Sequence, residues 1–280
     1  MPSNREAYFE ALNFGIPKEI ANFLLLEING FNYTELTNHF DDEIKSYDGF
    51  INAINRYKNG EMIEYIFNKA YFSCLLFYVD KNVLIPRQET EQLVLRVKEI
   101  IEKDFNNCSL DFADVCTGSG AIGICVRKYF LDTNISINAY LTDISKEAIR
   151  VAKKNAFGHG LNDINFLEGD MLEPLISKGI KLDVLVCNPP YIENESTIDE
   201  RTWKQEPHLA LLAKPCTFFY EKILKNLSLV MKDKYLLAFE IGEDMEKPLT
   251  DLINKYCPND SFCFKQDMYG KTRFLFIKHQ

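Results

Sequence analysis

Short strand-like segments and amphipathic helices alternate along the chain from Glu89 to its C-terminus. Helical periodicity predicts helices such as those over residues 89–101, 146–155 and 217–231. Apolar runs between the helices predict strands over residues 111–116, 135–141, 164–167, 182–187 and 235–241. Residues 261–265 and 272–278 predict a closing antiparallel pair around Tyr269-Gly270. Such alternation is typical of an α/β domain, in which helices cover both faces of a mainly parallel sheet.

Residues 1–70 have a different pattern, which predicts a small helical domain. Apolar side chains at mixed three- and four-residue spacing predict helices over residues 5–13, 17–27 and 41–58. Alternation from Phe72 to Tyr78, a turn at residues 80–82 and an apolar run at residues 83–85 then predict a β-hairpin connector over residues 71–86. Residues 87–280 would form the α/β domain.

The composition narrows the class of protein. The 280 residues are 46% hydrophobic and 26% charged, as in a soluble protein. The net charge of −9 argues against a general binder of the nucleic-acid backbone, because such proteins carry a basic field. No apolar run approaches the roughly 18 residues of a membrane helix, and the first ten residues lack the apolar block of a secretory signal. We therefore expect a cytoplasmic protein with no membrane partner.

The cysteines and histidines do not predict a metal site. The cysteines form no short CxxC pair, and the four histidines are scattered along the chain. In a cytoplasmic protein the thiols are expected to be reduced and mostly buried. The eight cysteines are at positions 74, 108, 116, 125, 187, 216, 257 and 263.

A glycine-containing turn, residues 116–120, follows the first predicted strand of the α/β domain. Its glycines, Gly118 and Gly120, would let the backbone approach a ligand closely. Asp143 ends the next strand, and an acidic residue about 20 positions beyond such a turn accepts hydrogen bonds from a ribose diol. Alternatively, the turn is an ordinary loop and the next helix is capped by Asp143 or by Ser145. Together the two features favour an adenosine-containing ligand, without separating NAD from S-adenosylmethionine.

The segment Asn188-Pro189-Pro190-Tyr191 directly follows the apolar strand at residues 182–187. Two prolines fix φ and remove two N–H donors, which makes the turn rigid. The Asn188 amide oxygen and the Pro189 carbonyl could then accept both hydrogens of one planar –NH2 group, with Tyr191 packed against its plane. Alternatively, the prolines end a strand and Asn188 caps locally. After a nucleotide-type βαβ unit, the segment resembles the Asn/Asp-Pro-Pro-Tyr signature of methyltransferases that modify planar amino groups.

Further segments resemble one methyltransferase family. Residues 83–91 are similar to the Ile-Pro-Arg-Pro-Glu-Thr-Glu segment of the HemK/PrmC family, the glutamine methyltransferases of peptide chain release factors. Residues 206–211 resemble its Glu-Pro-x-x-Ala-Leu element, and residues 240–242 its Glu-Ile-Gly pattern. The chain departs from the family at Cys116, where a glycine is usual, at Met62 and Gln88, where prolines are usual, and after Leu211, where a glycine-rich stretch is missing.

The resemblance implies a fold and a set of site residues. The fold would be a seven-stranded Rossmann-like S-adenosylmethionine-dependent methyltransferase domain with a small N-terminal helical domain that docks the substrate. The implied cofactor-binding residues are Cys116, Thr117, Gly118, Ser119 and Gly120 for the methionine part, Asp143 for the ribose, Asp170 and Met171 for the adenine, and Asn188. The implied substrate-binding residues are Asn188, Pro189, Pro190 and Tyr191, of which Asn188, Pro189 and Tyr191 would be catalytic. Arg87, Glu89 and Thr90 would organise the pocket floor.

The implied reaction transfers a methyl group to the side-chain amide nitrogen of the glutamine in the Gly-Gly-Gln motif of class I release factors, leaving S-adenosylhomocysteine. An adenine-amine methyltransferase acting on DNA or rRNA would use the same Asn188–Tyr191 turn, but the acidic charge argues against direct nucleic-acid binding. A nicotinamide dehydrogenase would leave that turn unexplained. A non-catalytic cofactor-binding scaffold would give the turn no task.

Overall fold

The computed structural model describes residues 1–105 and 109–279 of the chain, so Cys108 lies outside the described residues. The chain divides into two compact units, Met1–Asn68 and Lys69–Gln280. Each unit has buried apolar clusters of its own.

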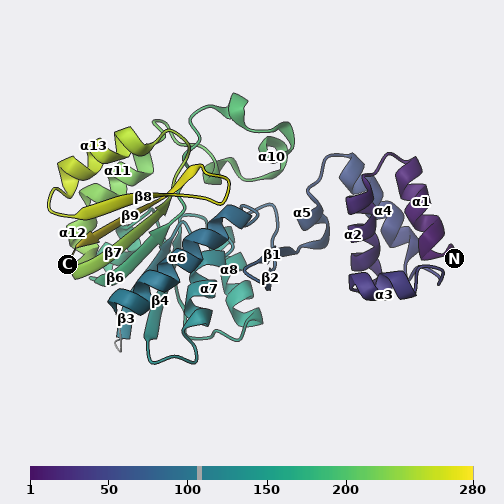
Figure 1. Cartoon of the computed structure of the whole chain (residues 1–280), viewed down its shortest axis with the longest axis horizontal. Coiled ribbons are helices and arrows are strands. Elements are labelled where there is room, and N and C mark those ends of the chain that lie inside the picture. The colour runs from purple at the N-terminus through teal and green to yellow at the C-terminus, as the bar shows by residue number, and fades with distance from the viewer. Residues whose placement is uncertain (106–108, 280) are drawn as a thin grey trace. The chain divides into compact units, whose positions relative to one another are not determined.

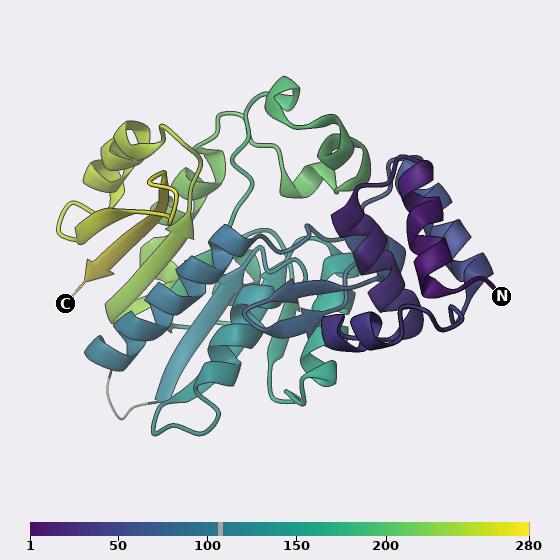
Figure 2. The ribbon, with the colours of Figure 1, turned by 45° about the vertical axis from the view of Figure 1, so that its right-hand side comes forward.

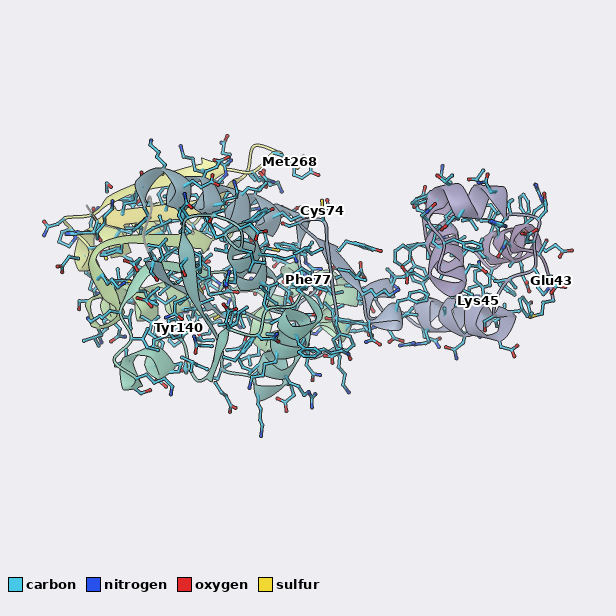
Figure 3. The ribbon with its side chains drawn as sticks, turned by 90° about the horizontal axis from the view of Figure 1, so that it is seen from below. Glu43, Lys45, Cys74, Phe77, Tyr140 and Met268 are labelled. Carbon is cyan, nitrogen blue, oxygen red and sulfur yellow. The ribbon has the colours of Figure 1, made fainter. Side chains whose placement is uncertain are left out.

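The first unit is helical. Its elements are α1 (Asn4–Asn13), α2 (Lys18–Asn29), α3 (Tyr33–Asn38), α4 (Tyr47–Lys58) and α5 (Ile63–Phe67). The helix predicted over residues 41–58 is too long, because Ser46 caps α4 by accepting a hydrogen bond from the Gly49 N–H. Glu43 and Lys45, labelled in Figure 3, therefore lie in the connection between α3 and α4, and α3 was not predicted.

The β-hairpin predicted over residues 71–86 is shorter than expected. Strands β1 (Ala70–Phe72) and β2 (Leu75–Phe77) pair antiparallel, and residues 83–85 form no strand. The turn lies at Ser73 and Cys74, whose φ angles are 48° and 60°; Cys74 is labelled in Figure 3. The alternation from Phe72 to Tyr78 predicts one strand, because neither turn residue is a glycine or an asparagine that would indicate a turn.

The second unit contains the seven-stranded sheet, which confirms the predicted fold class. Strands β3 to β7 run parallel, and β9 pairs antiparallel with both β7 and β8. The strand order within the described residues is β5-β4-β3-β6-β7-β9-β8. The strands are β3 (Ser109–Val115), β4 (Ser136–Asp143), β5 (Asn165–Glu168), β6 (Leu182–Cys187), β7 (Met231–Glu240), β8 (Ser261–Gln266) and β9 (Thr272–His279).

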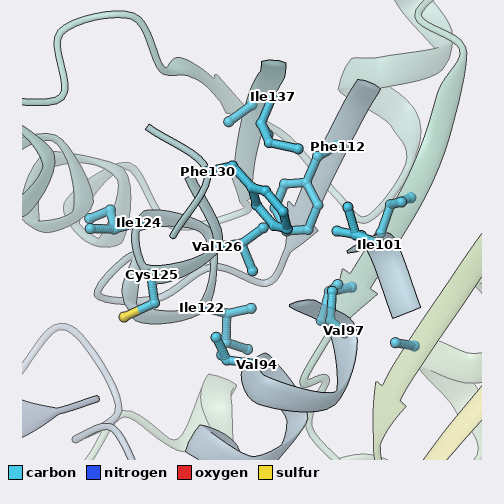
Figure 4. Packing of buried hydrophobic residues seen from close by; sticks show 14 of the residues in the cluster. Val94, Val97, Ile101, Phe112, Ile122, Ile124, Cys125, Val126, Phe130 and Ile137 are labelled. Carbon is cyan, nitrogen blue, oxygen red and sulfur yellow. The ribbon is translucent and has the colours of Figure 1, made fainter. Parts of the chain in front are cut away.

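Helices cover both faces of this sheet (Figure 1). One face packs on α6 (Gln88–Asp104), α7 (Ala121–Tyr129) and α8 (Lys146–Gly158). The other packs on α9 (Glu173–Ser177), α11 (Phe218–Lys225), α12 (Leu227–Val230) and α13 (Glu246–Tyr256). Figure 4 shows the first layer, where Val97 and Ile101 of α6 and Phe130, which follows α7, surround Phe112 of β3. Alternate residues of the strands supply the two cores, as expected for a sheet buried on both sides.

Residues 217–231 differ from the predicted structure, and residues 192–213 lie outside the layers of the sheet and its helices. The long helix predicted over residues 217–231 is divided into α11 and α12 at Asn226, and β7 begins at Met231. Residues 192–213 contain the short helices η1 (Glu195–Thr197), α10 (Glu200–Gln205) and η2 (His208–Ala210) and leave the layered sheet (Figure 2). Backbone hydrogen bonds from Ile192 to Leu211 and from Ala213 to Ile192 close the base of this excursion.

The thiols are less buried than predicted. Cys125, Cys187 and Cys257 are buried, whereas Cys74 and Cys263 are exposed and the other described cysteines are intermediate. All the described cysteines are free. No described helix is both long and apolar enough to cross a membrane.

Candidate active site

The carboxyl ends of five adjacent parallel strands meet at one edge of the sheet. Cys116 follows β3, Asp143 ends β4 and Asp170 follows β5. Asn188 follows β6 and Glu240 ends β7. The strand order reverses at β3, which pairs with β4 on one side and with β6 on the other. In open parallel sheets, ligands bind at the carboxyl ends beside such a point.

A cavity of about 210 Å³ opens at this edge, and we call it the β4-side cavity. Six of the predicted cofactor residues line it: Cys116, Gly118, Asp143, Asp170, Met171 and Asn188. Pro190 also borders it. The remaining lining is largely apolar and includes Leu84, Ile144, Ala148, Leu209 and Phe219. These apolar residues were not among the predicted site residues. The clearest signal in the sequence is Ile144, which directly follows Asp143 at the end of a predicted strand and is exposed in the structure.

Thr117, Ser119 and Gly120 do not line that cavity, although they belong to the predicted cofactor set. Thr117 and Ser119 are buried, and the Thr117 hydroxyl donates to Asp114 Oδ2 over 2.6 Å. Gly120 has a φ of 83°, and a Cβ there would lie 2.8 Å from Ile124 Cδ1. These residues therefore fold the turn against α7 and α8.

Asp143 keeps its carboxylate at the cavity wall. Its Oδ2 accepts from the Gly118 N–H and its Oδ1 from the Ser145 N–H, both over 2.9 Å. Burial raises the pKa of Asp143, and these backbone hydrogen bonds oppose the rise. The helix-capping task belongs instead to Ser145, whose hydroxyl accepts from the Ala148 N–H.

Asp170 and Met171 follow β5, far from the glycine-containing turn in the sequence, but they line the same cavity as Cys116 and Gly118. The Asp170 carboxylate pairs with Lys222 of α11. Met171 is buried with a φ of 51°, and its sulfur lies 3.5 Å from Cys116 Sγ. The thiol that replaces the usual glycine is thus packed against the segment following β5.

A second cavity of about 250 Å³, which we call the β7-side cavity, lies next to Asn188. Its walls include Pro189, Tyr191 and Glu240, together with Arg87 and the excursion formed by residues 192–213. The full lining is Leu84, Arg87, Asn188, Pro189, Tyr191, Ile192, Thr197, Ile198, Asp199, Thr202, Ala210, Leu211 and Glu240. Asn188 lines both cavities and therefore stands at their boundary.

Buried carboxylates connect the distant motifs. Glu206 Oε2 accepts from Arg87 Nη2 over 2.5 Å, and Glu206 Oε1 accepts from the Ile85 N–H. Glu240 Oε2 accepts from the Thr90 hydroxyl over 2.6 Å. Arg87 and Thr90 were predicted to organise the pocket floor, but their partners were not predicted, because the pairs are 119 and 150 residues apart in the chain.

Among the described residues, no cluster of three or more histidine, cysteine, aspartate or glutamate side chains could hold a metal ion. The polar groups that the structure places at this edge of the sheet are carboxylates, amides and the main chain of the proline turn.

The chain is similar to known methyltransferases in sequence. The family model "Methyltransferase small domain" matches residues 96–205. A release factor glutamine methyltransferase of Bacillus subtilis is 35% identical over 95% of this chain and 96% of that protein. Another, from Staphylococcus aureus, is 33% identical over 99% of this chain and its whole length.

The chain belongs to the release factor glutamine methyltransferase family.

Solved structures support the methyltransferase fold of this family member. A human methyltransferase 10 domain containing protein matches with a TM-score of 0.53 and 16% identity over 74% of this chain and 88% of that one. A SAM dependent methyltransferase from Agrobacterium tumefaciens matches with a TM-score of 0.51 and 12% identity over 76% and 69% of the two chains. At these identities the likeness concerns the fold alone.

Proposed function

We propose that the protein methylates the side-chain amide nitrogen of the glutamine in the Gly-Gly-Gln motif of class I peptide chain release factors. The methyl donor is S-adenosylmethionine, and the other product is S-adenosylhomocysteine. Full-length relatives named release factor glutamine methyltransferase support this reaction and do not favour the adenine-amine alternative.

The observation that carries the proposal is the position of Asn188. Its side chain borders both cavities, so one amide can contact a group in the β7-side cavity while lying beside a ligand in the β4-side cavity. The division of the proline turn supports the same assignment, because Pro189 and Tyr191 line the β7-side cavity and Pro190 lines the other. We therefore assign the β7-side cavity to the substrate glutamine and the β4-side cavity to the methyl donor.

The β4-side residues suit S-adenosylmethionine. Each Asp143 oxygen accepts one backbone N–H, which leaves lone pairs for the ribose hydroxyls. A Cβ at Gly118 would meet nothing within 4 Å, so the space beside the turn is open for the methionine part. The apolar side chains of Ile144, Ala148 and Phe219 suit the adenine ring. When bound, the cofactor supplies an electrophilic methyl group on a sulfonium.

The catalytic task of the protein is orientation. An amide nitrogen is a weak nucleophile, because its lone pair is delocalised into the carbonyl. Asn188 Oδ1 and the Pro189 carbonyl would accept the two N–H bonds and fix the direction of that lone pair, while Tyr191 packs against the amide plane. Such positioning contributes roughly 7–11 kcal/mol in well-oriented reactions. The two acceptors also favour the positive charge that develops on nitrogen, and the methylated amide becomes neutral when it loses one of its two N–H protons to water.

The acidic charge of the chain suits a basic protein partner. A protein that contacts RNA, as a release factor does, carries such a basic surface. Residues 1–68 contain 11 acidic and 5 basic side chains, so most of the net charge of −9 lies in the helical unit. We propose that this unit docks the release factor, that the enzyme does not bind nucleic acid directly, and that it works in the cytoplasm.

The test is mass spectrometry of a release factor after incubation with the protein and S-adenosylmethionine. We expect one methyl group on the Gly-Gly-Gln glutamine, and Asn188→Ala should lower the rate by about 10²–10³. Asn188→Asp keeps an acceptor and should retain part of the activity. Asn194→Ala, which removes an exposed asparagine from the neighbouring loop, is the matched control.

Two outcomes would contradict the proposal. A release factor that stays unmodified while adenine in DNA or rRNA is methylated would support the alternative reaction. Wild-type turnover by Asn188→Ala would make the proline turn a purely structural feature.

A further inference from the structure

Glu240 is a buried carboxylate at the carboxyl end of β7, and the reaction described above gives it no task. Only 3% of the residue is exposed. The Tyr220 hydroxyl donates to the Glu240 main-chain carbonyl over 2.8 Å, which fixes the backbone at this point. The Glu240 side chain accepts a hydrogen bond from the Thr90 hydroxyl over 2.6 Å. A buried carboxylate is costly unless it is hydrogen-bonded, so its neighbours are informative.

The Thr90 hydroxyl connects Glu240 to Asn188. A hydroxyl has a single hydrogen, and Thr90 gives it to Glu240, so a lone pair of Thr90 Oγ1 remains for Asn188 Nδ2 at 3.5 Å. Burial raises the pKa of Glu240, and hydrogen bonds from Thr90 and from Asn188 oppose the rise. The –NH2 group of Asn188 thus faces acceptors on both Thr90 and Glu240.

This arrangement selects one of the two orientations of the Asn188 amide. With the –NH2 group directed to Thr90 and Glu240, the oxygen is left for the cavities. In the reversed orientation the amide oxygen would face the Glu240 carboxylate and a lone pair of Thr90 Oγ1, and it would be repelled by both groups. The orientation matters for function because only the oxygen can accept an N–H bond from a glutamine substrate.

The other end of the proline turn also depends on this strand end. Burial raises the pKa of the Tyr191 hydroxyl, and the Glu240 carboxylate raises it further, whereas Arg273 and Arg87 oppose the rise. Two residues beyond Glu240, a Cβ at Gly242 would lie 3.0 Å from Tyr191 Cδ2. The absence of a side chain at Gly242 therefore leaves room for the Tyr191 ring.

We propose that Glu240 and Thr90 are positioning residues, which hold the Asn188 amide with its oxygen toward the substrate glutamine. The inference rests on the proposed function and deepens it. It also explains why segments around residues 90, 188 and 240 converge on one point of the fold.

The decisive variant is Glu240→Gln. A glutamine keeps the shape and can still accept from Thr90, but its new –NH2 group faces the –NH2 group of Asn188. We expect the Asn188 amide to reverse, so that it presents a donor to the donor of the substrate. The kcat for release-factor methylation should fall by about 10²-fold, as for loss of one positioned polar partner. The KM for the release factor and the affinity for S-adenosylhomocysteine should change little.

Variants of Thr90 separate a positioning effect from direct contact between Glu240 and substrate. Thr90→Val keeps the side-chain shape but removes the bridging hydroxyl, and should lower kcat by about tenfold. Thr90→Ser restores the hydroxyl and should restore most of kcat. If Glu240 acted on the substrate directly, Thr90→Val would leave kcat unchanged.

Asp260→Asn is the matched control. Asp260 is a buried carboxylate that accepts from Tyr235 and lies 2.6 Å from His279 Nδ1, at the opposite end of the strands. It undergoes the same change from carboxylate to amide, and we expect wild-type kcat. Thermal unfolding of each variant shows whether the fold is retained.

The outcomes are distinct. Wild-type kcat in both Glu240→Gln and Thr90→Val, with an active wild-type enzyme, overturns this inference and leaves the proposed function standing. A wild-type enzyme that does not methylate the release factor contradicts the proposed function, and the inference falls with it. A selective loss of kcat that Thr90→Ser restores supports the positioning role.

Discussion

Two aspartates flank the glycine turn, and their surroundings differ. Asp143 borders the β4-side cavity, where its oxygens retain acceptor capacity. Asp114 is completely buried behind the turn, where Oδ2 accepts from Thr117 and the Gly123 N–H and Oδ1 has no hydrogen-bond partner. Accessible Asp143 can bind a ligand, whereas buried Asp114 acts on the stability of the turn.

Replacing Asp143 tests the ribose assignment. Asp143→Ala should weaken binding of S-adenosylhomocysteine by about 1.5–3 kcal/mol, because a charged acceptor of hydroxyl hydrogens is lost. Calorimetric titration measures the affinity directly. Asp163→Ala, which removes a carboxylate paired with Arg127, should bind the ligand as the wild type does. Unchanged affinity in Asp143→Ala would show that Asp143 only braces the turn.

Replacing Asp114 tests the effect of burial on pH dependence. Burial raises the pKa of Asp114 from 3.8 to about 7, with a smaller rise from Asp143, while Thr117 and Gly123 oppose the rise. The folded state therefore holds a proton that the unfolded state releases, so stability is lost as pH rises from about 4 to about 7. Asp114→Asn cannot ionise and lacks this loss.

The measurement is urea unfolding of both proteins across that pH range. The stability of the wild type relative to Asp114→Asn should fall by a few kcal/mol with rising pH and level off above about 7. A constant difference across this pH range would mean that folding does not raise the pKa of Asp114.

At the scale of elements, the excursion formed by residues 192–213 supplies part of both cavities. Pro207 and Leu209 border the β4-side cavity, and Thr197 and Leu211 border the β7-side cavity. The excursion is held at its base by Ile192 and in its middle by the buried Glu206. One carboxylate thus supports the walls of two binding regions.

Glu206→Gln should loosen this excursion. The new –NH2 group faces the Arg87 guanidinium, so a charge-assisted hydrogen bond of about 1.5–3 kcal/mol is lost, less whatever water restores to the partly exposed Arg87. We expect faster tryptic cleavage at Arg201 and Lys204 and weaker binding of S-adenosylhomocysteine. Glu200→Gln in α10 removes an exposed pair with Lys204 and is the control. Equal cleavage rates in the two variants would contradict the anchoring role.

The sequence predicted the elements that carry strong local signals. The strand at residues 182–187 and the positions of Asp143 and Asn188 at strand ends follow from apolar runs that stop at polar residues. The turn at Ser73 and Cys74 and the break at Asn226 have no such signal. The hydrogen bonds of Glu206 and Glu240 join segments that are far apart in the chain. The resemblance to the family identified these segments, but it did not predict the hydrogen bonds between them.

At the scale of the whole molecule, the two units have separate cores. Buried side chains of α1, α2 and α4 form one cluster, and the two faces of the sheet form the others. The methyltransferase unit therefore contains both cavities without any residue of the helical unit.

Removal of residues 1–68 tests this division of tasks. The chain from residue 69 onward should bind S-adenosylhomocysteine as the full chain does, since every residue of the β4-side cavity remains. The KM for an intact release factor should rise by at least about tenfold, because the acidic unit that we propose as the docking surface is lost. The matched comparison is a short peptide containing Gly-Gly-Gln, whose KM should change little. An unchanged KM for the release factor would remove the docking role from the helical unit.

The place of Asn188 on the boundary of both cavities has a thermodynamic consequence. A ligand in one cavity that changes the position of the Asn188 amide also changes the affinity of the other cavity for its ligand. The two binding equilibria are therefore linked, and the coupling free energy is the same in both directions. We expect a bound release factor to change the affinity for S-adenosylhomocysteine by the same factor by which S-adenosylhomocysteine changes the affinity for the release factor. The affinity for S-adenosylhomocysteine would therefore differ between the enzyme with release factor bound and the enzyme without it.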